Sequence, residues 1–395
     1  MHDIPLKVEA MAISHRWLLL HRAALALAAL SVAVPLAADE RRGTMAFHYG
    51  GPLSQAELEW YGRFDAVVTH DPLPRAQVDA LHARGAHLVL YEWAVAFYAS
   101  LVPTGSWQER LLRERHALLN GRGLRGGSGA ADADAFYYDP AAHEHRIDRA
   151  RAIAERLHTA GYDGVFLDTT TFANVHPDAA AEYRQRHPDV PYDAAFAQFL
   201  KTLRKELHGG VIVTNQGYRD AAHYLPYADY DVTESLITRD GRLRPWRDPR
   251  DQWNSIDFVM RTMIAPAMKR YPRVRFVHLN YLPKAEPDDV LPVAAIARLF
   301  GGEAFVALSS IVAPPSADIY FLDCGTPRTP IRYAEKHEAA YRWFAHVLVA
   351  VNASAHPLVI ANPDGGEAIV VPAAENGSMG TLITARPITR NHGHP

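Results

Sequence analysis

Two acidic residues stand at the ends of apolar, β-rich segments. Asp168 ends the run GVFLD, and Glu234 ends the run YDVTE. Two carboxyl groups in a concave, partly dry site can have different pKa values, so that one donates a proton while the other acts as base or nucleophile. Cleavage of a glycosidic bond needs such a pair. We predict Glu234 as general acid and Asp168 as nucleophile or base, with the reverse assignment left open. The structural alternatives are a helix cap for Asp168 and an ion pair with Arg239 or Arg242 for Glu234.

Other polar and aromatic residues stand at or just after the ends of similar runs, and we predict that they bind substrate. These residues are Tyr49, Asp71, Glu92, Trp93, Asn215, Asn280 and Tyr281. Glu92 fits a salt bridge at the rim equally well, and Asp71 before Pro72 is typical of a turn. The two asparagines could instead orient the carboxylates. Aromatic faces for sugar stacking are predicted at Trp93, Trp107, Trp246 and Trp253.

The chain has 21 histidines, which raises the question of a metal site. His48, His70 and His278 lie near strand ends, and Asp71 is adjacent to one of them. A metal-dependent hydrolase is therefore a competing hypothesis, although the helical HExxH pair and the GxSxG elbow are both missing from the sequence. We expect no metal and no cofactor, because carboxylates alone can carry the proton transfers.

The segments that would position these residues alternate between strands and helices. Continuous apolar strand cores indicate a parallel sheet covered on both faces, and eight βα units favour a (β/α)₈ TIM barrel. The predicted strands are Thr44–Gly51, Phe64–Pro72, Ala86–Trp93, Gly164–Thr170, Val211–Gly217, Tyr230–Leu236, Val274–Tyr281 and Ala304–Ser309. The predicted helices are Ser54–Arg63, Arg75–Arg84, Trp107–Asn120, Ile147–Ala160, Tyr192–Leu207, Ile256–Tyr271, Asp288–Phe300 and Ala334–Phe344. A Gly-rich loop is expected at Gly121–Ala130.

The regions outside the barrel have different patterns. Basic residues precede the apolar run Ala23–Ala37, which is typical of a signal peptide ending near residue 38, although an uncleaved N-terminal anchor is an alternative. We expect export to the periplasm or the medium, with no membrane segment in the mature form. The barrel is predicted at 44–345, a small antiparallel β appendage at 346–388, and a disordered tail at 389–395.

Composition excludes several classes of protein for this chain of 395 residues. The net charge of −3 provides no basic surface for nucleic acid, and one cysteine cannot form an internal disulfide or a Cys-rich zinc site. The expected partner is a polysaccharide, and the oligomeric state is not indicated.

A family resemblance rests on several motifs in order along the chain. They are Tyr138-Asp139-Pro140, then Ala160-Gly161-Tyr162-Asp163-Gly164-Val165-Phe166-Leu167-Asp168, and more loosely Tyr91-Glu92, Val213-Thr214-Asn215 and Asp231-Val232-Thr233-Glu234-Ser235. Over about Thr44 to Ser309 the chain resembles glycoside hydrolase family 114, the endo-α-1,4-polygalactosaminidases, and related bacterial proteins. The resemblance implies a barrel glycosidase with Asp168 and Glu234 as its catalytic carboxylates.

The chain departs from that family at two places. Thr169-Thr170-Thr171-Phe172 follows the strand-four aspartate, and Phe47-His48-Tyr49 replaces a Trp-containing first strand. These differences leave the sugar open between α-galactosaminide, another amino-sugar exopolysaccharide and a neutral polysaccharide. A second hypothesis is a non-catalytic polysaccharide-binding barrel that serves polymer export or surface assembly.

Overall fold

The computed structural model describes residues 42–114, 118–124, 135–168, 170–172, 175–283, 287–308, 318–363, 365–375 and 379–385. The predicted signal peptide and the predicted tail lie outside these residues. Within them, no helix is long and apolar enough to cross a membrane.

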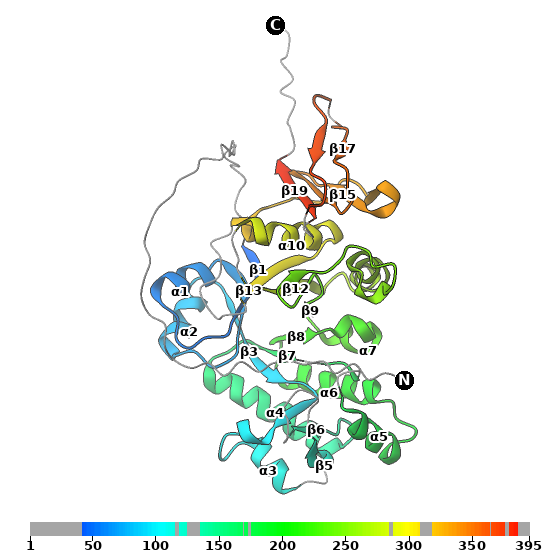
Figure 1. Ribbon diagram of the computed structural model, residues 1–395. Coiled ribbons are helices and arrows are strands. Elements are labelled where there is room, and N and C mark those ends of the chain that lie inside the picture. Colours follow the sequence, from blue (N-terminus) through cyan, green and yellow to red (C-terminus); the bar gives the residue numbers. More distant parts are fainter. Residues whose placement is uncertain are drawn as a thin grey trace, which may run out of the picture.

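The predicted (β/α)₈ barrel is confirmed, and all eight predicted strands form one parallel sheet in chain order (Figure 1). Its strands are β1 (Gly43–His48), β2 (Phe64–Thr69), β3 (His87–Trp93), β7 (Gly164–Asp168), β8 (Val211–Asn215), β9 (Tyr230–Glu234), β12 (Arg275–Leu282) and β13 (Glu303–Leu308). The end strands β1 and β13 contact each other, and the rings of Phe47 and Phe305 are 5.6 Å apart. The sheet is therefore a nearly closed barrel.

Helices cover the outer face of the barrel. They are α1 (Gln55–Tyr61), α2 (Arg75–His82), α4 (His143–Ala160), α5 (Pro177–Arg186), α6 (Tyr192–Glu206), α7 (Ala221–Tyr224), α8 (Ile256–Val259), α9 (Ala265–Arg270) and α10 (Pro287–Phe300). Ser54 and Glu57 form the expected capping box before α1. Gly161 ends α4 with φ +75°, where a side chain would be strained. The predicted helix Ile256–Tyr271 is present but contains a π turn, Met260–Ile264.

The register of the strands decides which side chains face the inside of the barrel. Partners in a parallel ladder face the same way, and neighbours along a strand face opposite ways. Phe166 on β7 contacts Phe47 across the barrel at 5.8 Å, so its side chain lies inside. Asp168 is two residues further on and also faces inward. Tyr91 pairs with Phe166 and Trp93 pairs with Asp168, so both point inward, whereas Glu92 between them points toward the helices.

The segment between β3 and α4 differs from the prediction. The predicted helix Trp107–Asn120 is shorter, because α3 (Trp107–Arg113) ends and β5 (Leu118–Leu124) follows. Leu118 and Leu119 are fully buried and pair with Tyr138 and Tyr137 of β6 (Ala135–Tyr138). The predicted Gly-rich loop begins inside β5, and its later residues lie outside the described part. With β4 (Ala96–Tyr98) these strands form an antiparallel sheet of order β4-β6-β5.

The C-terminal region forms the small antiparallel sheets that the sequence predicts. One sheet has the order β14 (Arg332–Ala334), β15 (Ala339–Trp343), β16 (Val347–Asn352) and β19 (Gly380–Ala385), and the other pairs β17 (Leu358–Ile360) with β18 (Ile369–Val371). Helix α10 lies between them and the barrel (Figure 1).

The predicted helix Ala334–Phe344 is wrong. Its alanines and alternating charges favour a helix locally. However, Ala339 and Trp343 are buried against Leu348 and Leu358, and β15 pairs along its whole length with β16. Tertiary packing therefore overrides the local preference.

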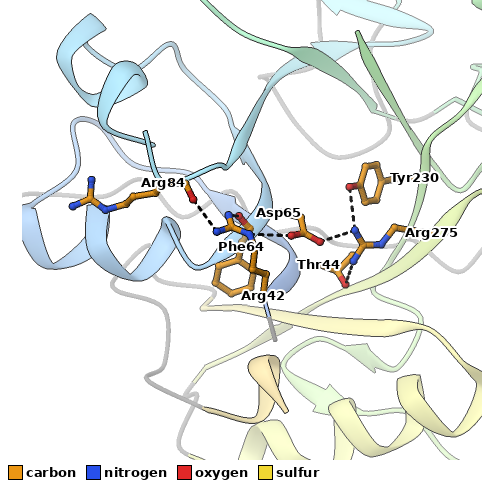
Figure 2. Close-up of polar contacts among 7 residues, drawn as sticks. All are labelled: Arg42, Thr44, Phe64, Asp65, Arg84, Tyr230 and Arg275. Carbon is orange, nitrogen blue, oxygen red and sulfur yellow. Dashed lines mark hydrogen bonds and ion pairs between the residues drawn. The ribbon is translucent and has the colours of Figure 1, made fainter. Parts of the chain in front are cut away.

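Asp65 joins three strands at the end of the barrel where the strands begin (Figure 2). Its Oδ1 accepts from Arg42 Nε at 3.0 Å and its Oδ2 from Arg275 Nη1 at 2.7 Å. Arg275 on β12 also donates to Thr44 Oγ1 on β1 at 2.7 Å. These contacts connect the first strand to β2 and to β12.

We expect Asp65→Ala to lower the free energy of unfolding by about 1 kcal/mol, because two partly exposed arginines lose their acceptor. Chemical denaturation measures this, and the loss should shrink at high salt. Asp79→Ala removes an exposed contact with Arg75 and is the matched control. An equal effect in both variants would contradict a specific role of Asp65.

Candidate active site

Asp168 and Glu234 lie side by side at the carboxyl ends of β7 and β9, and Asn215 of β8 lies between them. Asn215 Nδ2 donates to Asp168 Oδ1 and to Glu234 Oε2, both at 2.7 Å. Both acceptors are carboxyl oxygens, so the amide nitrogen must be the atom that faces them. We call Asp168 and Glu234 the carboxylate pair. Because one nitrogen bonds to both, the two accepting oxygens lie only about 5 Å apart.

Two tyrosines hold the outer oxygens of the carboxylate pair. Tyr91 on β3 donates to Asp168 Oδ2 at 2.6 Å, and Tyr281 on β12 donates to Glu234 Oε1 at 2.9 Å. The hydroxyl of Tyr49, just after β1, lies 2.7 Å from that of Tyr281. Since the Tyr281 proton points to Glu234, Tyr49 is the donor in this contact. Side chains from six strand ends thus form one network.

Burial and charge set the protonation of this network. Burial raises the pKa of Glu234, and the nearby charge of Asp168 raises it further, while the bonds from Asn215 and Tyr281 lower it. Burial likewise raises the pKa of Tyr91, Tyr281 and Tyr49, which keeps these hydroxyls protonated as donors. The pKa of Glu234 therefore lies above that of an ordinary glutamate.

The hydrogen bonds leave both carboxyl groups able to react. Each of the four oxygens of the carboxylate pair accepts one hydrogen bond from the described residues. A carboxyl oxygen has two lone pairs, so one on each oxygen is left for a proton or a substrate atom. The hydrogen bonds therefore leave a free lone pair on each of the two neighbouring groups.

Glu92 does not join the carboxylate pair. It points outward, is buried, and accepts from Arg156 Nη1 at 2.7 Å. Burial raises its pKa, and the neighbouring arginines Arg156 and Arg149 lower it. Of the two roles open from the sequence, the structure places it in the salt bridge.

A cavity of about 860 Å³ is lined by the end of β3, the segment after it and one face of α4, with Glu92 and Arg156 among its residues. Neither Asp168 nor Glu234 lines it, but Tyr91, which donates to Asp168, does. Trp93, Asp71 and Trp107 line it as well. The ring of Trp93 packs edge-on against Tyr91 at 5.4 Å and against Tyr98 at 5.1 Å. Among the other candidate stacking residues, Trp246 is buried, whereas Trp253 is exposed.

Asn280 faces away from the site. Its Oδ1 accepts from the backbone N–H groups of Ile237 and Thr238, at 3.0 and 2.9 Å, and its Nδ2 donates to the His278 carbonyl at 3.0 Å. Its amide is satisfied by the protein and holds the loop that follows Glu234. The predicted contact of Asn280 with substrate is therefore corrected to support of that loop.

The histidines near strand ends do not converge on a metal site. His278 is buried on the outer face of β12, with Nδ1 2.5 Å from Thr233 Oγ1, and burial lowers its pKa to about 4. His48 Nε2 contacts the Gly51 carbonyl at 2.7 Å, and His70 stacks on Tyr91. No group of three or more His, Cys, Asp or Glu side chains in the described residues could hold a metal ion.

Sequence reasoning missed Tyr91 as a site residue. The signal was present in the alternation of β3, because Tyr91 and Trp93 share one face and Glu92 the other. Choosing the inward face requires the register with β7, which the sequence does not provide.

Comparisons with known proteins show similarity at the level of fold. No protein-family model matches the sequence, and no curated protein matches it. The glycoside hydrolase domain of PelA from Pseudomonas aeruginosa matches with 23% identity and a TM-score of 0.49, over 68% of this chain and 95% of that domain. Ega3 of Aspergillus fumigatus, solved in complex with galactosamine, matches with 11% identity and a TM-score of 0.46, over 69% and 93% of the two chains.

A third solved glycosidase covers more of this chain. The cyclic α-maltosyl-(1→6)-maltose hydrolase of Arthrobacter globiformis matches with 11% identity and a TM-score of 0.49, over 87% of this chain and 98% of its own. The chain is similar in structure to these three glycoside hydrolases, each at low identity. The roles proposed below for Asp168 and Glu234 are argued from the hydrogen bonds and distances in this chain.

Proposed function

We propose that this chain is an exported, retaining glycoside hydrolase that acts on a polysaccharide. One observation carries the proposal: Asn215 Nδ2 bonds to both Asp168 and Glu234 at 2.7 Å. Retaining glycosidases hold their two carboxyl groups about 5–5.5 Å apart, whereas inverting enzymes need roughly 6.5–9.5 Å to admit a water molecule. The spacing of about 5 Å between the bridged oxygens supports the retaining geometry.

In this mechanism Glu234 donates its proton to the glycosidic oxygen as the bond to the anomeric carbon breaks. Asp168 attacks the anomeric carbon and forms a glycosyl ester, while the leaving sugar departs as an alcohol. Glu234, now ionised, takes a proton from water, and the resulting hydroxide displaces Asp168. Tyr91 and Asn215 donate to Asp168 and hold it in place for attack.

The cavity beside Tyr91 and Trp93 supports a polymer as substrate, because aromatic faces and adjacent polar groups suit several sugar units. The motif resemblance favours an amino-sugar polymer. The charge of the pair agrees with this choice, since carboxylates attract the ammonium group of an unacetylated hexosamine.

We expect the first sugar released to keep the configuration of the cleaved bond. A panel of α- and β-linked polymers, with polygalactosamine included, would identify a substrate by its release of reducing ends. Proton NMR of the anomeric signals in the first minutes of the reaction then distinguishes retention from inversion, before mutarotation mixes the products.

Inversion of configuration would contradict the retaining mechanism. Binding of a polymer without cleavage would favour the non-catalytic barrel instead. The same panel with Asp168→Asn is the control for contaminating activity.

A further inference from the structure

Asp231 on β9 is a buried carboxyl group that the proposed mechanism does not use. It is fully buried and faces outward, next to inward-facing Val232. Burial raises its pKa to about 7, although its hydrogen bonds with Thr214, Tyr218 and Gly217 lower it. The described residues place no cationic side chain in an ion pair with it. A carboxyl group without a cation is costly to bury, so its role needs an explanation.

The hydrogen bonds of Asp231 hold the turn that follows Asn215. Its Oδ1 accepts from Thr214 Oγ1 and from Gly217 N, both at 2.7 Å, and its Oδ2 accepts from Tyr218 N at 2.9 Å. Three donors are therefore shared between two oxygens of one carboxyl group. An asparagine would offer only one acceptor oxygen and would turn an N–H toward another donor.

The turn itself leaves little freedom. Gln216 has φ +64°, in the left-handed region, directly after Asn215. A Cβ added to Gly217 would lie 2.6 Å from Thr214 Oγ1 and 2.8 Å from Asp231 Oδ1. The backbone at 216–218 thus packs closely against Asp231.

The side chain of Asn215 depends on this backbone. Its Nδ2 bridges the carboxylate pair, but its Oδ1 is buried and has no hydrogen-bond partner among the described residues. The backbone of Asn215 and the two carboxyl groups that accept its hydrogen bonds therefore set the orientation of the amide. A shift of the turn would move Nδ2 away from Asp168 and Glu234.

The next strand uses the same arrangement. Asn280 on β12 accepts from Ile237 N and Thr238 N, which follow Glu234, and Ser235 has φ +54°. In both places an outward-facing residue holds the turn after the functional residue of the preceding strand.

We propose that Asp231 is a positioning residue that holds the turn at 216–218 and thereby keeps Asn215 bridged between Asp168 and Glu234. Its effect on turnover rests on the proposed function. Its effect on the geometry of Asn215 does not rest on the proposed function. An experiment can therefore test the positioning role and the proposed function separately.

The kinetic test compares Asp231→Asn with Asp229→Asn. Asp229 precedes β9 and accepts from Ile212 N at 2.8 Å and Arg204 Nη2 at 2.7 Å, at the opposite end of β8 from Asn215. We expect Asp231→Asn to lower kcat about 10- to 100-fold with KM changed less than about twofold, because misplacement by about 1 Å costs rates of this order. Asp229→Asn should lower Tm and leave kcat unchanged.

A second variant covers the case in which Asp231→Asn does not fold. Gly217→Ala displaces the turn from an intact Asp231 and should lower kcat in the same way. Equal kcat in the wild type and in a folded Asp231→Asn or Gly217→Ala would overturn the proposal.

A measurement that needs no substrate separates the two proposals. Asp168, Asn215 and Tyr281 act directly on Glu234. Tyr49 and Tyr91 are near enough for the charge of Glu234 to raise their pKa. Since the bond from Asn215 lowers the pKa of Glu234, its loss in Asp231→Asn should shift the carbon-13 titration of the Glu234 carboxyl upward. The signal is assigned by its absence in Glu234→Gln.

The titration and the hydrolysis assay together distinguish failure of the positioning role from failure of the proposed function. A shifted titration in Asp231→Asn, together with no hydrolysis by the wild type, would reject the proposed function and keep the positioning role. An unchanged titration in a folded Asp231→Asn would reject the positioning role.

Discussion

Asp168→Asn is expected to lower kcat roughly 10⁴-fold. An amide cannot form the glycosyl ester, and it lacks the negative charge that stabilises positive charge on the sugar. The substitution also places a second NH₂ group next to Asn215 Nδ2 or the Tyr91 hydroxyl, which both donate to this side chain. Reducing-end assays on the best substrate of the panel measure the loss.

Covalent labelling tests the same residue directly. A 2-deoxy-2-fluoro glycoside of the cleaved sugar should label the wild type, and mass spectrometry should locate the label on the peptide that contains Asp168. Asp65→Ala, at the opposite end of the barrel, should be labelled like the wild type. A label on Glu234 would reverse the assigned roles.

Glu234→Gln is expected to lower kcat/KM about 10²- to 10⁴-fold on a natural polymer. The amide cannot donate a proton to a leaving sugar, so the loss should be small for aryl glycosides whose leaving group needs no proton. A similar loss on both substrates would contradict the role of Glu234 as general acid.

The pH dependence of hydrolysis follows from the protonation of Glu234. A general acid works when protonated, so activity falls as the pH rises through its pKa. Burial and the charge of Asp168 raise the pKa of Glu234, so the alkaline limb should lie above that of an ordinary glutamate. On an aryl glycoside, this limb should disappear in Glu234→Gln, since no titrating acid is left.

Much of the fold was predictable from local patterns. The eight strands have continuous apolar cores, and the helices between them have caps at Ser54 and Gly161, so their order and type follow from short-range physics. The prediction failed at β5 and β15. There, Leu118 and Trp343 are buried by strands distant in sequence, and pairing with those strands outweighs helix propensity.

The functional residues divide in the same way. Sequence placed Asp168, Asn215 and Glu234 at strand ends, because an apolar run that stops at a polar residue marks where the chain leaves the core. It could not say that Glu92 and Asn280 face outward or that Tyr91 faces inward. Side chains alternate along a strand, and only the register between β3 and β7 and between β9 and β12 selects the inward face.

The sequence by itself therefore determined that the chain forms a barrel and that the acids stand at the ends of its strands. Three features depend on contacts between neighbouring parts of the fold. They are the hydrogen bonds from one amide to both acids, the ion pair of Glu92, and the hydrogen bonds that Asp231 accepts from the turn at 216–218. Those contacts are made only when the sheet closes in one register, and that register results from the packing of the whole barrel.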